Sequence, residues 1–175
     1  MSDLFFVEDA ILARASDETD GLNPMIRQFA QQFGIADPER YVIDFTPASK
    51  QLLQGEIDPA DLADTSATKY PQFHVWVKGS IDQADEIGSE FSGIITAQVR
   101  LLLSWRGGDA MKVQYDKVAR CFVAAMGSAF NRNQHGEYAS PALPLPFSFM
   151  RTPITRSEEN WGQGILYTMP FRVTL

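Results

Sequence analysis

The side chains able to do catalytic or metal-binding chemistry are few, and their spacing matches no familiar site. The two histidines are His74, in a segment that alternates apolar and polar residues, and His135, in a polar loop. Neither has a second ligand at the spacing of a metal site, so we interpret both as surface or edge histidines. The single cysteine, Cys121, lies beside Phe122 in an amphipathic stretch, which is typical of a packed thiol rather than a nucleophile.

Two further patterns resemble part of a known site, but the other sequence elements of each site are missing. "SATK" at 66–69 has the Ser-x-x-Lys spacing of the acylating pair in penicillin-binding enzymes, but the Ser-Asp-Asn and Lys-Thr-Gly elements of that site do not occur. The acidic stretch 79–90 lacks the glycine-bearing spacing of an EF-hand loop, so we interpret it as a solvated loop. The sequence therefore predicts no metal, no cofactor and no enzymatic activity.

The elements that would position these residues are clearest in the second half of the chain. Residues 91–105 alternate apolar and polar side chains, which predicts a strand on the order of 50 Å long with one buried face. Residues 71–78 and 164–175 alternate in the same way. Between them, 109–130 has apolar residues at steps of three and four, which predicts an amphipathic helix.

These elements predict an α+β fold with a mainly antiparallel sheet. We expect the long strand to pair with 71–78 and with 164–175, and the helix 109–130 to pack on its apolar face. A helix at 3–16 should add to this layer. The expected core residues are Val99, Leu101, Val118, Phe122 and Met126.

The first third of the chain has weaker signals. Asn23-Pro24 reads as an N-cap followed by proline at the first turn of a second helix, and Gly34 suits its C-terminal end. Similar start signals at Thr46-Pro47 and Asp58-Pro59 predict two short helices, and 41–45 predicts a short strand. We interpret 17–69 as an irregular acidic segment that wraps a core made elsewhere.

The segment 141–153 has the pattern of an extended arm or an edge strand. Pro144 and Pro146 remove two N–H groups from the same edge, so this segment can pair on one side only. We expect it to contact another subunit or partner through the alternating apolar residues Leu145, Phe147 and Phe149.

Length and composition restrict the class of protein. With 175 residues and 45% apolar content, the chain predicts a single soluble domain over 1–175. No apolar run approaches the length of about 18 residues that a membrane span needs. The first ten residues are acidic, which does not fit a signal peptide. One cysteine fits a reducing compartment.

Charge is unevenly distributed along the chain. The net charge is −7, but residues 1–65 hold 13 acidic and 4 basic residues, a net of −9, whereas 66–175 carry +2. DNA binding by phosphate neutralisation needs a basic stripe and is disfavoured. Two interpretations stay open: a solvated acidic surface, or a surface that repels nucleic acid or meets a basic partner.

A strand longer than one domain core raises the question of what covers its distal apolar face. Another chain can do so, and a ring or tube of identical subunits meets the need by symmetry. This inference favours an assembly subunit over an enzyme.

The order of elements resembles the tail terminator (tail completion) proteins of long-tailed bacteriophages. The resemblance rests on "KYPQFHVWVKGS", "EFSGIITAQVRLLLSW", "DAMKVQYDKVARCFVAAMGSAF" and "LYTMPFRVTL", and covers roughly residues 70–130 and 164–175. The segments 17–69 and 141–153 depart from that family, the first by its length and the second as an addition.

The resemblance implies a structural virion subunit assembled in the bacterial host cytoplasm. It implies a homohexameric ring at the head-proximal end of the tail tube, which ends tube growth and joins the tail to a head–tail connector or stopper protein. The other implied partner is the tail tube protein, and DNA would pass through without specific binding.

The acidic first third suggests a further role within such a ring. Carboxylates that line a DNA channel repel phosphates, and our candidates for this lumen are Asp58, Asp61 and Asp64. Two alternatives remain: another phage neck or head–tail joining protein, and a small intracellular α+β enzyme or ligand-binding domain whose site the sequence does not reveal.

Overall fold

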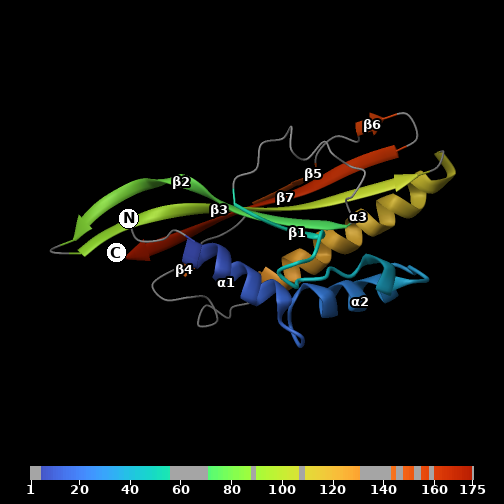
Figure 1. Ribbon diagram of the computed structural model, residues 1–175, viewed down its shortest axis with the longest axis horizontal. Coiled ribbons are helices and arrows are strands. Elements are labelled where there is room, and N and C mark those ends of the chain that lie inside the picture. Colours follow the sequence, from blue (N-terminus) through green and yellow to red (C-terminus); the bar gives the residue numbers. More distant parts are fainter. Residues whose placement is uncertain are drawn as a thin grey trace.

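The protein has an α+β fold in which helices cover one face of a long, twisted sheet (Figure 1). The computed structural model describes residues 5–55, 71–87, 90–106, 109–130, 143–144, 148–151, 155–157 and 160–174. The helices are α1 (Phe5–Ser16), α2 (Leu22–Gln32), the 3-10 helix η1 (Pro38–Tyr41) and α3 (Asp109–Phe130). The strands are β1 (Leu52–Gln54), β2 (Gln72–Ile87), β3 (Glu90–Arg106), β4 (Leu143–Pro144), β5 (Ser148–Arg151), β6 (Thr155–Ser157) and β7 (Asn160–Thr174).

The sheet is built around β3, as the sequence predicts. Its strand order is β1-β2-β3-β7-β4, and β5 and β6 also pair with β7. Every described pairing is antiparallel except that of β1 with β2. The register places Val75, Val99 and Tyr167 side by side across the three long strands.

The hairpin of β2 and β3 is longer than predicted. We expected 79–90 to be a solvated loop, but β2 continues to Ile87 and pairs with the start of β3. The register shifts between Val77 and Ile81 and again between Asp82 and Asp85. Irregularities of this kind add residues to one strand, so they break the period-two pattern by which a strand is recognised. The three long strands extend beyond the helices at one end of the molecule (Figure 1).

The core lies between the sheet and the helices. All five predicted core residues are confirmed, with Val118 1% exposed and the other four fully buried. Helix α2 contributes four buried side chains, so the segment 17–69 does more than wrap a core made elsewhere. The buried residues of α2 are Leu22, Met25, Ile26 and Ala30.

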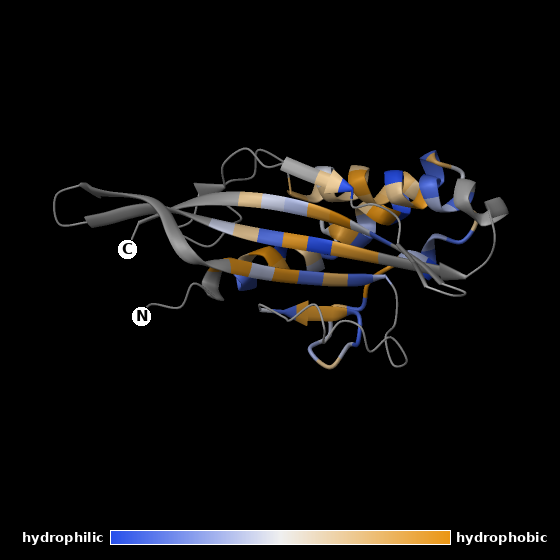
Figure 2. Ribbon diagram, turned by 90° about the horizontal axis from the view of Figure 1, so that it is seen from above, coloured by the Kyte–Doolittle hydropathy of each residue, from blue (hydrophilic) through white to orange (hydrophobic). Residues whose placement is uncertain are grey.

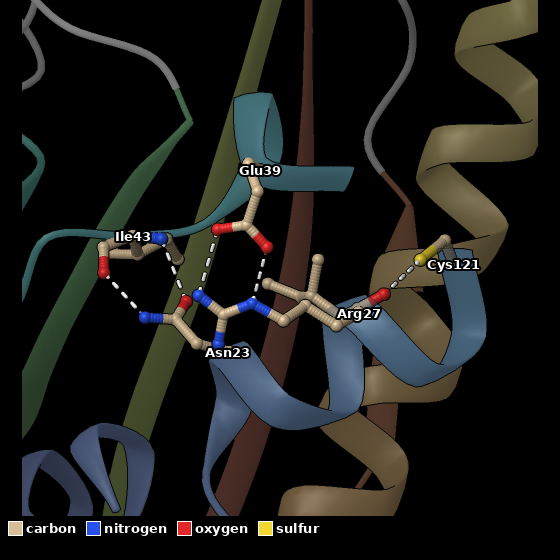
Figure 3. Close-up of polar contacts among 6 residues, drawn as sticks. Asn23, Arg27, Glu39, Ile43 and Cys121 are labelled. Carbon is tan, nitrogen blue, oxygen red and sulfur yellow. Dashed lines mark hydrogen bonds and ion pairs between the residues drawn. The ribbon is translucent and has the colours of Figure 1, made fainter. Parts of the chain in front are cut away.

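The prediction that Asn23 caps α2 is wrong. The helix begins at Leu22, and Gly21 occupies the N-cap position without a side-chain hydrogen bond. The Asn23 amide instead joins two elements, because its Nδ2 donates to the Ile43 carbonyl at 2.7 Å and its Oδ1 accepts from the Ile43 N–H at 2.8 Å (Figure 3). This paired bond satisfies both backbone groups of a residue that lies in no strand.

Two other contacts hold α2 in place. Arg27 on its exposed side makes a bidentate ion pair with Glu39 of η1, at 2.6 and 3.0 Å (Figure 3). On its buried side, the Cys121 thiol of α3 donates to the Ile26 carbonyl at 3.6 Å. Cys121 is 2% exposed, which confirms the predicted packed thiol, and burial raises its pKa to about 11.

The end of α2 follows the prediction. Gly34 has a φ of +65°, the left-handed conformation that favours glycine after a helix. Its N–H donates to the Gln31 carbonyl, and the Ile35 N–H donates to Ala30, so the last carbonyls of the helix are satisfied in a Schellman motif.

Two predictions for residues 41–50 are wrong. Tyr41 ends η1, and 42–45 form no strand because side chains of Asn23 and Gln51 occupy the N–H groups of Ile43 and Asp44. Thr46-Pro47 opens a turn rather than a helix. The second expected short helix, at Asp58-Pro59, lies outside the described residues.

The described parts of 141–153 are edge strands of the chain's own sheet. β4 and β5 pair with β7, and Phe149 stands opposite Tyr167 in that ladder. Arg151 at the end of β5 donates to Asp116 of α3 at 3.0 Å and to Gln163 of β7 at 3.1 Å. This end of the segment is therefore fastened to its own subunit.

Candidate functional site: the sheet face opposite the helices

A polar cluster lies on the face of the sheet that the helices do not cover. Side chains alternate between the two faces along β2 and β3. Phe73, Val75 and Val99 therefore belong to the helix-side core, whereas His74, Trp76 and Arg100 point the other way. Figure 2 shows the sheet from above, with hydrophilic and hydrophobic residues alternating along the strands.

His74 is held by two hydrogen bonds that fix its tautomer. Its Nε2 lies 2.8 Å from the Gly55 carbonyl, and its Nδ1 lies 3.1 Å from Nη2 of Arg100. A carbonyl only accepts and a guanidinium only donates, so Nε2 carries the proton and Nδ1 is the acceptor. With both ring nitrogens occupied, His74 has no free position for acid–base catalysis.

The expectation of a surface or edge histidine is wrong for His74. The side chain is 2% exposed. β1 pairs in parallel beside β2 and brings the Gly55 turn against the imidazole. That contact joins residues 19 positions apart, and no local pattern reports it. His135 lies outside the described residues.

Arg100 is a cation in a desolvated position. Its guanidinium carbon lies 5.5 Å from the Trp76 ring centroid, and Trp76 in turn stacks on His74 with centroids 4.4 Å apart. Burial lowers the pKa of Arg100. Its Nε is buried and makes no hydrogen bond, and within the described part of the chain no carboxylate reaches ion-pair distance of it.

Glu8 of α1 binds the outer edge of β2 at the point where the pairing with β1 ends. Its carboxylate accepts from the Val77 N–H at 2.9 Å, just beyond the three residues that β1 pairs. Glu8 is 5% exposed, and burial is the main cause that raises its pKa. Residue type gave no signal for this role, since Glu8 reads as an ordinary acidic helix residue.

Most of the predicted interface and lumen residues fall outside the part of the chain that the structure describes. Asp58, Asp61, Asp64, Leu145 and Phe147 lie outside the described residues. Phe149 lies in β5, next to the ladder with β7. The contacts proposed for these residues stay predictions.

The comparisons with known proteins add no family to this description. No protein-family model matches the chain, and no curated protein matches it at a significant level. Among the residues that the structure describes, no three His, Cys, Asp or Glu side chains gather as a metal site would require. In the same part of the chain, none of the helices has the length and apolar character needed to span a membrane.

The burial of His74 predicts a loss of stability in mild acid. The pKa of His74 is lowered from 6.5, by burial first and by the positive charge of Arg100 as a further cause. Above pH 6.5 the imidazole is neutral in both folded and unfolded chains, and its contribution is complete. As the pH falls from there through the folded pKa, the unfolded chain binds a proton that the folded chain resists, so the free energy of unfolding falls.

Urea denaturation between pH 7.5 and 5 checks this effect, with His74→Gln as the matched variant. Glutamine has no titrating group, so the difference in unfolding free energy between wild type and variant should shrink as the pH falls. Glu8 changes the stability in the opposite direction. Its pKa is raised from 4.5 in the folded chain, so the free energy of unfolding falls as the pH rises above 4.5. Taking the difference between the two proteins removes that contribution. A difference that stays constant with pH would contradict a buried neutral His74.

Proposed function

We propose that this chain is a structural subunit of a bacteriophage neck, a tail terminator that forms a ring at the head-proximal end of the tail tube. The observation that carries the proposal is the extension of β2, β3 and β7 beyond the helix layer (Figure 1). Three strands of 16, 17 and 15 residues are far longer than the usual five or six. One subunit's helices cannot cover them over their full length.

The edge of this extension supports an assembly role. From residue 78 to Ile87, no described strand pairs with the outer side of β2. Long free edges invite pairing with other chains, and proteins normally shorten or cover them. In a ring, the neighbouring subunit covers each extension by symmetry.

The surroundings of the single cysteine and of the described histidine also support a structural role. Both nitrogens of His74 are occupied, and the one thiol is buried with a raised pKa. We propose that the ring ends tube growth, contacts tail tube protein on one side and a connector or stopper protein on the other, and lets DNA pass. Asp58, Asp61 and Asp64 remain our candidates for the channel wall.

Solution mass tests the proposal. We expect a species of about six times the 19.5 kDa chain mass, formed alone or on addition of tail tube protein. Replacing residues 79–95 by an Asn-Gly turn and ending the chain after Met169 removes the extension from all three strands and keeps core pairs such as Val77 with Ala97 and Ala97 with Met169. That variant should stay folded and monomeric. A wild-type chain that remains monomeric with tube protein, or a shortened chain that still forms rings, would contradict the proposal.

A further inference from the structure

Arg100 is a charged group whose charge nothing in the described structure neutralises. Buried or half-buried cations are normally paired with an anion, because desolvating an unpaired charge is costly. The described hydrogen-bond partner of the guanidinium is the neutral His74 ring, and Nε has none. A guanidinium carries five N–H donors in a planar fork, and the described hydrogen bond uses one of them. Arg100 remains partly exposed, so an outside group can reach it.

The surroundings of Arg100 hold it ready for an anion. Trp76 supports the guanidinium plane from one side, and His74 fixes one Nη through a hydrogen bond. His74 is itself fixed by the Gly55 carbonyl. A planar donor held in this way matches a carboxylate, which can accept two parallel N–H bonds from arginine. The low dielectric of a half-buried site strengthens that pairing.

The chain itself carries an excess of the matching group. Residues 1–65 have a net charge of −9, and their exposed carboxylates include Asp9, Glu18 and Asp37. Asp9 lies in α1, Glu18 in the turn that follows it and Asp37 just before η1. The helices α1 and α2 and the 3-10 helix η1 lie on the helix side of the sheet (Figure 1). Arg100 lies on the opposite face, because it alternates along β3 with the buried core residues Val99 and Leu101. A contact between these two surfaces therefore joins the helix side of one copy to the opposite sheet face of the next. Such head-to-tail contacts close into a ring when the rotation from one copy to the next is a whole fraction of a full turn.

We propose that Arg100, positioned by His74 and Trp76, binds a carboxylate from residues 1–65 of a second copy of this chain. This inference rests on the proposed ring and names one of the contacts that build it. His74 and Trp76 are positioning residues, and Arg100 is the group that touches the partner.

Arg100→Gln tests the contact through two measurements, which are the strength of self-association and the melting temperature of the separated subunit. Self-association should weaken by at least about 30-fold, the equivalent of about 2 kcal/mol for truncating one member of a buried charge pair. The melting temperature of the separated subunit should stay the same or rise, because an unpaired desolvated charge is removed. Arg40→Gln changes an exposed cation of η1 and is the matched control, with association expected within about twofold of wild type.

Zero-length crosslinking identifies the partner carboxylate. Arg100→Lys places an amine at the same position, which a carbodiimide joins to a carboxylate in direct contact. Rings assembled from equal parts of ¹⁴N and ¹⁵N chains should give mixed-isotope peptides that link position 100 to an acidic residue within 1–65. Links confined to single-isotope peptides, or links to residues beyond 65, would overturn the inference.

The outcomes separate this inference from the proposed function. A wild-type chain that never self-associates contradicts both. Wild-type rings together with Arg100→Gln rings of equal stability contradict the Arg100 contact and leave the ring standing. A lower melting temperature for the separated Arg100→Gln subunit, with unchanged association, would show that Arg100 acts within its own fold only.

Discussion

A Phe122→Asp variant should fail to fold. Phe122 is fully buried in α3, where its ring meets Tyr41 edge-on with centroids 6.4 Å apart. Removing an aromatic side chain from a core costs about 3–5 kcal/mol, and an unpaired buried carboxylate adds several more. Together these costs reach the total stability of about 5–15 kcal/mol that is typical of one domain. We expect no cooperative thermal transition and loss of the near-ultraviolet circular dichroism signal.

The same substitution on the exposed side of α3 is the control. Gln114→Asp introduces the same carboxylate eight positions earlier on the helix, where the side chain meets water. Its unfolding free energy should lie within about 0.5 kcal/mol of wild type. A Phe122→Asp protein that is soluble and melts cooperatively would show that Phe122 is not part of the core.

Gly21→Ala should cost at least about 3 kcal/mol, a large effect for the addition of one methyl group. A Cβ at this position would lie 2.3 Å from the Asp17 carbonyl oxygen and 2.6 Å from that of Ala15. Both are backbone atoms, one in the turn after α1 and one in the last turn of α1 itself, so no side-chain movement relieves the contact. In a domain of this size the melting temperature should fall by about 6–12 °C.

Gly34→Ala at the other end of α2 provides the comparison. Nothing lies within 4 Å of its added Cβ, but the φ of +65° disfavours any L side chain. This strain alone costs about 1–2 kcal/mol. In calorimetry, the melting temperature of Gly21→Ala should therefore be clearly lower than that of Gly34→Ala. The reverse order would mean that the α1–α2 turn can open to accept a methyl group.

These two glycines illustrate what the sequence could and could not predict about the fold. Gly34 follows an amphipathic run, and that local signal is sufficient to identify a helix end. Gly21 is required by the path of the preceding turn, which becomes visible only in three dimensions. Likewise, α3 and the buried face of β3 follow from side-chain periodicity. The continuation of β2 to Ile87 does not, because register shifts interrupt its alternation.

The candidate site was less predictable than the fold. His74, Trp76 and Arg100 are visible in the sequence as alternating strand residues, but their spacing says nothing of a shared contact. They meet because β2 and β3 pair with His74 opposite Arg100. The burial of His74 depends in addition on Gly55, which a short parallel strand brings from another part of the chain. An interaction set by strand pairing has no local sequence signature.

The ladder between β3 and β7 also governs the order in which this protein can fold. Its nearest pair joins Arg106 to Asn160, which is 54 positions later, and its most distant pair joins Ser92 to Thr174. The β2–β3 hairpin and α3 need only local contacts, so they can form early during synthesis. At about 5–20 residues per second, a ribosome leaves the central strand without its second neighbour for several seconds. During that interval an apolar strand edge is open to other nascent chains, which makes β7 the segment whose arrival ends the period of greatest aggregation risk.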